Sequence, residues 1–125
     1  MPWFLGALLF VGFDPTVLTI DLTTVSQNLT TRDLIGIATS SAEKYHLTPK
    51  QTRRMLKTIQ CESGWDNSAV GPVGEVGLIQ FYPPAHTDLT REQMTNVYFE
   101  LNWMAEQVSF GNGAKLWTCW RLLFS

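Results

Sequence analysis

The sequence predicts a mainly α domain of the α+β class, a small helical unit in which a short β-hairpin or loop follows one of the helices. The first observation is that three threonines are each followed, three residues later, by a side chain that suits a capping box at a helix start. These pairs are Thr30 with Asp33, Thr48 with Gln51, and Thr90 with Gln93. The second observation is that four glycines crowd between the second and third predicted helices, where such a density marks tight turns. They are Gly64, Gly71, Gly74 and Gly77.

The composition narrows the class of protein. The chain has 125 residues, of which 45% are hydrophobic and 16% are charged, as is typical of one globular domain of modest size. Its net charge is -2 and it has no long run of basic residues, so no nucleic-acid partner is expected. Five tryptophans are many for this length, and their flat faces suit a saccharide ligand as well as a core.

The N-terminal segment, residues 1–29, is expected to lie outside the folded domain, which we place at residues 30–125. Residues 1–13 form an apolar run that is shorter than the roughly 20 residues needed to span a bilayer. The run has the length of the apolar part of an export signal, but no Lys or Arg precedes it and no A-x-A site follows. A remnant or misplaced start of an export signal, an apolar element packed on the domain, and an anchor in contact with a membrane surface all stay open. Residues 14–29 are rich in Thr and predict an extended linker with a short strand at residues 17–22.

The first helix is predicted to run from Thr30 to about His46. It is a packing helix, because its apolar residues share one stripe at helical spacing. These residues are Leu34, Ile37, Ala38, Ala42 and Tyr45. His46 is interpreted as a charge at the helix C-terminus, since His86 is the only other histidine and their spacing does not fit a metal site. We expect neither a metal nor a cofactor.

The second helix carries one carboxylate, Glu62, to the start of the glycine-rich loop. Thr48 is its predicted N-cap and Pro49 its first residue. Met55 and Ile59 lie seven and three residues before Glu62, which places all three on one helical face. A carboxyl group against apolar side chains loses hydration and therefore favours its protonated form, which suits a general acid. The alternative interpretation is a polar residue at a frayed helix end that turns back to water.

The rest of the chain predicts a long central helix and a short final one. Thr90 caps a helix whose apolar residues repeat at helical spacing up to Gly111, a natural stop. Asn96 and Tyr98 lie on this helix, and we assign them to the core before any contact with substrate. Residues 114–123 predict a short helix.

Residues 62–83 form a longer motif, E-S-G-W-D-N-S-A-V-G-P-V-G-E-V-G-L-I-Q-F-Y-P. It resembles the soluble lytic transglycosylase family, whose motif reads approximately E-S-x-(F/W)-(N/D)-x-x-A-V-S-P-x-G-A-x-G-L-M-Q-I-M-P, and the spacing is kept without a gap. Residues 61–64 (C-E-S-G) and 111–119 (G-N-G-A-K-L-W-T-C) are similar to two segments of the resuscitation-promoting factors, which are small secreted muralytic domains. Both families have a lysozyme-like fold and cut peptidoglycan, so the two resemblances agree.

The resemblance implies a peptidoglycan lytic transglycosylase, a glycosidic-bond lyase that cuts the MurNAc-GlcNAc β-1,4 bond and leaves 1,6-anhydro-muramic products. Glu62 is then the one catalytic residue, first as acid and then as base. The transglycosylase family carries a Tyr-Asn pair near the end of the domain, whose tyrosine lines the cleft, and this sequence has no such pair there. Trp117 or Trp120 is expected to take the place of that tyrosine. With the motif residues, the expected substrate-binding residues are Ser63, Gln80, Tyr82, Trp117 and Trp120.

Two positions depart from the family motif. Glu75 replaces the family's small residue between two glycines, and Gly71 replaces its cleft serine. Many glycoside hydrolases use two carboxylates, so Glu75 is either a second functional carboxylate that turns the chemistry toward hydrolysis or a solvated charge. The alternatives to a lyase are therefore a lysozyme-like muramidase and a non-catalytic peptidoglycan-binding domain.

The expected partner is the glycan strand of peptidoglycan, and the expected state is a monomer. Arg53, Arg54 and Lys57 lie on the outer side of the second helix, where they are solvated or help the domain to dock on an anionic wall polymer. Cys61 and Cys119 most simply form a disulfide if the protein is exported, and the resemblance to the resuscitation-promoting factors implies the same bond. Two free thiols in a cytosolic protein are the alternative. With the disulfide, the protein is secreted, periplasmic or associated with the cell wall.

Overall fold

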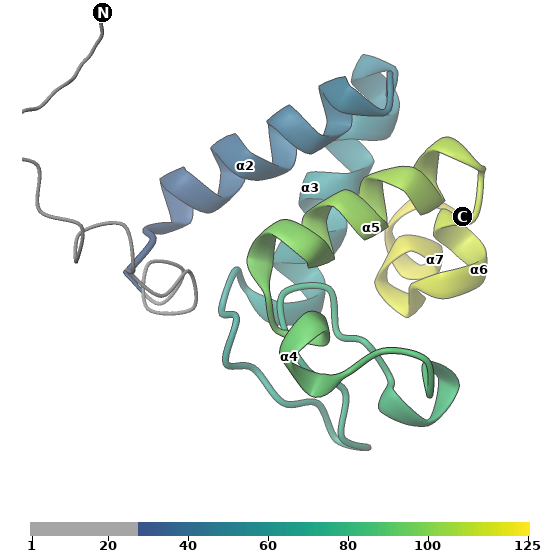
Figure 1. Ribbon diagram of the computed structural model, residues 1–125. Coiled ribbons are helices and arrows are strands. Elements are labelled where there is room, and N and C mark those ends of the chain that lie inside the picture. Colours follow the sequence, from purple (N-terminus) through teal and green to yellow (C-terminus); the bar gives the residue numbers. More distant parts are fainter. Residues whose placement is uncertain (1–27) are drawn as a thin grey trace, which may run out of the picture.

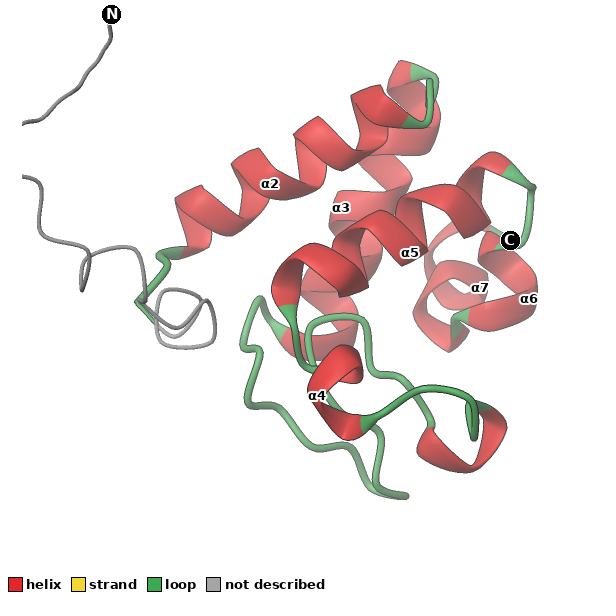
Figure 2. Ribbon diagram, in the orientation of Figure 1, coloured by secondary structure: helices red, strands yellow, loops and turns green. Residues whose placement is uncertain are grey.

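The computed structural model describes residues 28–125 (Figure 1). The apolar run at residues 1–13 and the strand expected at residues 17–22 lie outside the described residues. The described part is mainly helical, as Figure 2 shows, which confirms the predicted fold class. Its elements are α2 (Thr31–Lys44), α3 (Pro49–Ser63), the 3-10 turn η2 (Pro83–Ala85), α4 (Arg91–Met94), α5 (Val97–Ser109), α6 (Gly113–Leu116) and α7 (Thr118–Phe124). Within residues 28–125, no helix is long and apolar enough to cross a membrane.

The predicted capping boxes start α2, α3 and α4. At α2, Asp33 N donates to Thr30 Oγ1 at 3.1 Å, and Thr30 N donates to the Asp33 carboxylate at 2.9 Å. Thr48 and Gln51 exchange the same two hydrogen bonds at 3.1 and 2.8 Å. Each box satisfies backbone N–H groups that have no partner inside the helix, which fixes the residue at which the helix begins.

Two of the predicted helices are broken, and both breaks have a local cause. The single helix expected from Thr90 to Gly111 is wrong: the chain leaves the helix after Met94, and Asn96 caps a new one by accepting from Phe99 N at 3.1 Å. The helix expected at residues 114–123 is divided at Trp117, whose backbone is extended (φ -120°, ψ 121°). α6 and α7 are therefore short helices joined at one tryptophan.

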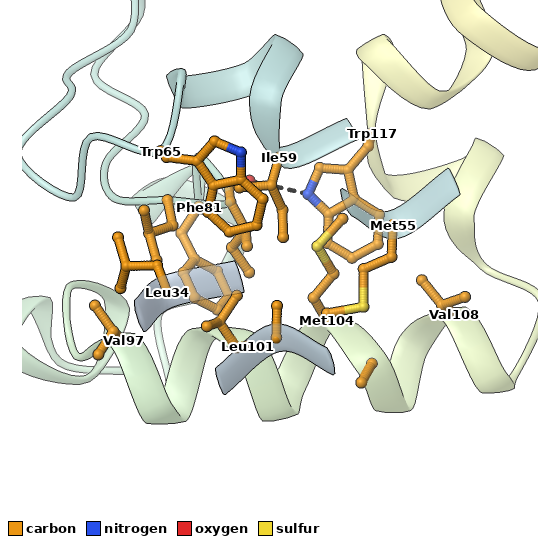
Figure 3. Close-up of a cluster of buried hydrophobic side chains, with 14 of the residues drawn as sticks. Leu34, Met55, Ile59, Trp65, Phe81, Val97, Leu101, Met104, Val108 and Trp117 are labelled. Carbon is orange, nitrogen blue, oxygen red and sulfur yellow. Dashed lines mark hydrogen bonds between the residues drawn. The ribbon is translucent and has the colours of Figure 1, made fainter. Parts of the chain in front are cut away.

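The core is built around α5, which packs against α2 and α3 (Figure 3). Figure 1 shows α3 passing behind α5, between α2 and the pair α6 and α7. The buried side chains come from all three long helices and from the loop before η2. They include Leu34, Ala38, Met55, Ile59, Leu78, Ile79, Phe81, Val97, Leu101, Met104 and Val108. Burial of this apolar surface is the main force that holds the helices together.

The glycine-rich loop after α3 folds over one end of this core. It contains two isolated antiparallel bridges, Val70 with Val76 and Val76 with Phe81, where a short hairpin was expected. Gly77 has φ 85°, and a Cβ there would collide with the Glu100 side chain and with the Met94 carbonyl. Only glycine allows the loop to approach α5 so closely.

A disulfide joins Cys61 at the end of α3 to Cys119 in α7, which confirms the predicted pair. The two Cα atoms are 6.0 Å apart, within the usual range for a disulfide. The bond closes a loop of 58 residues and stabilises the fold by about 4 kcal/mol on the chain-entropy model. It also holds α7 beside the helix end that carries Glu62.

Candidate functional site

Glu62 is the last residue but one of α3, and the chain turns sharply directly after it. Gly64 closes the helix in the left-handed conformation (φ 62°). The Ser63 hydroxyl donates to the Ile59 carbonyl and accepts from Trp65 N, both at 3.2 Å. Ser63, one of the predicted substrate-binding residues, therefore serves the turn that ends the helix. This turn leaves Glu62 at the junction between the core and the loop.

The Glu62 carboxylate is half-buried and has a fixed partner. The backbone N–H of Cys119 donates to Glu62 Oε2 at 3.2 Å, across a separation of 57 residues. Burial is the largest influence and raises the pKa of Glu62 above its usual value, while the Cys119 hydrogen bond opposes the shift. The charge of Glu75 raises this pKa further, and Arg121 lowers it. The protonated form is thus more favoured than in a fully hydrated glutamate, as expected for a carboxyl group with reduced hydration.

Glu75 lies near enough to Glu62 for their charges to interact, and its carboxylate is folded back over the loop. Val73 N donates to Glu75 Oε1 at 3.0 Å. A Cβ added at Gly71 would collide with Glu75 Oε1 and would lie 2.7 Å from Gln80 Oε1. The glutamate carboxylate therefore occupies space that a side chain at position 71 would need. The two departures from the family motif are therefore linked: the larger side chain of Glu75 fits because position 71 is a glycine.

Gln80 is oriented by two hydrogen bonds. Its Nε2 donates to the Ala69 carbonyl at 3.2 Å and to the Gly77 carbonyl at 2.9 Å. Both amide hydrogens are thereby used, so Oε1 turns to the side of Gly71 and Glu75. The result is a pair of acceptors, an amide oxygen and a carboxylate, on the same side of the loop. Such a pair suits hydroxyl or amide N–H groups of a ligand.

The two predicted tryptophans lie on either side of Cys119 but make packing contacts. Trp117 is 4% exposed, and its indole N–H donates to the Ile79 carbonyl at 2.9 Å, the bond drawn at its nitrogen in Figure 3. Trp120 is half-buried, and its ring covers Gly113 so closely that a Cβ there would collide with it. Tyr82, by contrast, is 43% exposed. Of the predicted aromatic contacts, Tyr82 is the most exposed residue.

Three features of this region were not expected from the sequence: the Cys119 N–H, the Arg121 charge and the buried Glu100. Glu100 is fully buried, and Ile79 N donates to its Oε1 at 3.5 Å. Burial raises the pKa of Glu100 to about 9, so this carboxyl group is neutral at pH 7. The sequence did contain a signal for this burial: helical spacing places position 100 on the apolar stripe of α5, between Val97 and Met104.

One further hollow lies near the loop but does not include Glu62. This hollow of 480 Å³ is lined by residues 65–70 of the loop, by Arg91 at the start of α4 and by Asn96 between α4 and α5. Among the described residues, no group of three or more His, Cys, Asp or Glu side chains could hold a metal ion. The candidate site is therefore the junction of α3, the loop and α7.

A family model described as Transglycosylase SLT domain matches residues 39–106, more than half of the chain. The match includes Glu62, Glu75, Gln80 and Tyr82, and it ends before the α6 and α7 segment that supplies the Cys119 N–H. No curated protein and no solved structure matches the chain significantly. On the family model and the helical fold together, the chain belongs to the transglycosylase SLT domain family.

Proposed function

We propose that the protein is a peptidoglycan lytic transglycosylase that uses Glu62 as its single catalytic residue. The observation that carries the proposal is a half-buried carboxyl group inside the matched region, at the glutamate of the motif that residues 62–83 resemble, with a raised pKa and a fixed hydrogen bond from Cys119 N. The domain, residues 30–125, acts on glycan strands at the MurNAc-GlcNAc β-1,4 bond. A structural disulfide fits an oxidising compartment, so the protein works outside the cytoplasm.

The proposed reaction needs one carboxyl group in two protonation states. Protonated Glu62 gives its proton to the glycosidic oxygen, and the bond between that oxygen and C1 of the muramic sugar breaks. The N-acetyl group of the same sugar stabilises the developing charge at C1. Glu62 then takes the proton of the C6 hydroxyl while the C6 oxygen bonds to C1, so the 1,6-anhydro ring closes without water. The carboxyl group ends the cycle protonated, as it began.

The neighbouring residues have different parts in this proposal. Gln80 Oε1 accepts a hydrogen bond from the sugar, and the exposed ring of Tyr82 contacts a sugar face. Ser63 contributes through the turn that places Glu62. Trp117 and Trp120 hold the segment that presents Cys119 N, so we assign them a positioning role.

A hydrolase is the second candidate, because Glu75 lies within electrostatic range of Glu62. As a base, Glu75 would remove a proton from water as the water attacks C1, which is the two-carboxylate scheme of inverting glycosidases. The products then carry a reducing end in place of the anhydro ring. A non-catalytic wall-binding domain is the third candidate.

Mass spectrometry of a digest of purified peptidoglycan separates these candidates. A lyase gives muropeptides that are one water lighter than those of a muramidase, and a binding domain pellets with the wall and leaves it uncut. Glu62→Gln should lose at least 100-fold in rate, the usual range for removing an acid–base group. The matched control is Glu43→Gln on the exposed side of α2, which should cut as the wild type does. Full activity of Glu62→Gln would refute the assignment of the catalytic residue.

A further inference from the structure

One face of α3 concentrates the positive charge of the molecule. It carries Lys50, Arg53, Arg54 and Lys57, four of the nine Lys and Arg residues of the chain. Spacings of three, four and seven residues place them along one side of the helix. No Asp or Glu occurs between Glu43 and Glu62, although the protein as a whole has a net charge of -2. We call these four residues the α3 cationic face.

The α3 cationic face borders a hollow of 240 Å³, which is lined by the four cations and Phe124. Phe124 comes from α7, which the disulfide to Cys61 holds beside α3. The Arg54 guanidinium lies 4.9 Å from the centre of the Phe124 ring. No carboxylate lines the hollow, and no ion pair joins the four cations to an acidic group within residues 28–125. Four positive charges on one helix face repel one another, and this repulsion destabilises the folded protein. An anionic ligand bound there would reduce the repulsion.

We propose that the α3 cationic face binds a linear phosphodiester polymer attached to the cell wall, such as poly(glycerol phosphate), and so docks the domain on its substrate. The location on the wall rests on the proposed function; the ligand chemistry rests on the charges alone. From Lys50 to Lys57 the helix rises about 10 Å, so the cations form a short line that matches a chain with one negative charge per repeat. Arginine also pairs with phosphate through two parallel hydrogen bonds.

The geometry favours such a polymer over a lipid surface. The most exposed apolar side chain of α7, Leu122 at 75%, lies two residues from Phe124 and hence about 200° around that helix. Leu122 and the α3 cationic face therefore lie on different sides of α7, whereas an interfacial site would require them in one plane.

Docking on this face leaves the candidate active site free. Glu62 follows Lys57 by five residues, which is about 8 Å along α3 and about 140° around it. A polymer on the cationic face can thus hold the domain while a glycan strand reaches Glu62. This arrangement also allows binding and cleavage to be measured separately.

The test compares two fourfold variants of the whole chain with the same net charge. The first is K50Q/R53Q/R54Q/K57Q, and the control, R32Q/K44Q/R91Q/K115Q, removes four exposed cations elsewhere. Binding of purified poly(glycerol phosphate) is measured against NaCl concentration. The wild type should show a slope of log K against log salt of about -2 to -3, since each phosphate contact on a flexible chain contributes about -0.7. The cationic-face variant should lose at least tenfold in affinity at low salt and most of the slope, while the control keeps both.

Three results of the binding experiment would overturn the proposal. The two variants lose affinity equally, so that only net charge matters; the wild type binds the polymer no better than the cationic-face variant does; or phosphatidylglycerol vesicles bind as tightly as the polymer and displace it. Circular dichroism and melting temperature establish that both variants fold. A wall digest distinguishes the two proposals. If the protein binds the polymer but cleaves no wall, polymer binding by the α3 cationic face is supported and the proposed enzyme activity is refuted. Cleavage that is equally fast on walls extracted with hydrofluoric acid, which removes phosphodiester polymers, keeps the enzyme and rejects the docking role.

Discussion

Glu100→Gln tests the claim that a neutral carboxyl group is buried beneath the loop that carries Gln80. The pKa of Glu100 is about 9 in the folded protein and near 4.5 in an unfolded chain. Between these values the unfolded chain releases a proton that the folded protein keeps, so stability falls as pH rises from about 4.5 to about 9. Each pH unit costs about 1.4 kcal/mol, which amounts to about 3 kcal/mol at pH 7. Glutamine has nearly the same shape and does not ionise, so the variant escapes this loss.

The assay is urea unfolding of both proteins at several pH values between 4.5 and 8.5, with the disulfide intact and tryptophan fluorescence as the signal. Glu100 Oε2 has no hydrogen-bond partner within residues 28–125, so the glutamine amide group adds a constant cost of about 1–3 kcal/mol at every pH. The diagnostic is therefore the slope: the stability of the variant relative to the wild type should rise by about 1.4 kcal/mol per pH unit. Exposed Glu43→Gln is the control. A difference that does not change with pH would refute the buried, neutral state of Glu100.

Further predictions concern the site and the disulfide. Glu75→Gln removes a charge that raises the pKa of Glu62, so the alkaline limb of the pH–rate profile should move to lower pH, and Arg121→Gln should move it to higher pH. Shifts of both variants in the same direction would contradict the electrostatic account. Gly71→Ser should destabilise the fold by about 1–3 kcal/mol through its collision with Glu75, and Gly71→Ser/Glu75→Ala should recover most of this in a double-mutant cycle. Simple additivity of the two changes would show that they are independent. Reduction of the disulfide should lower the free energy of unfolding by about 4 kcal/mol in urea titrations, and a loss below 1 kcal/mol would show that packing alone holds α7 in place.

The helix starts and the position of Glu62 were accessible from sequence because they depend on neighbours in the chain. The boxes at Thr30, Thr48 and Thr90 each join residues three positions apart. Met55 and Ile59 share a face with Glu62 through helix geometry alone, and both are fully buried. The pairing of Cys61 with Cys119 was expected because they are the two cysteines of the chain and because the family resemblance implies the same bond, and the structure confirms it.

Tertiary structure alone decided how the site is held together. The Cys119 N–H meets Glu62 across 57 residues, the Trp117 indole reaches the Ile79 carbonyl across 38, and Glu100 meets Ile79 across 21. Each of these contacts depends on how α5 and the segment from Trp117 into α7 pack against the end of α3 and the glycine-rich loop. A capping motif fixes only the backbone of one helical turn, whereas the pKa of a carboxyl group depends on everything that surrounds it in space. The sequence therefore singled out Glu62 as the candidate acid, and the packing of distant segments determined the environment that raises its pKa.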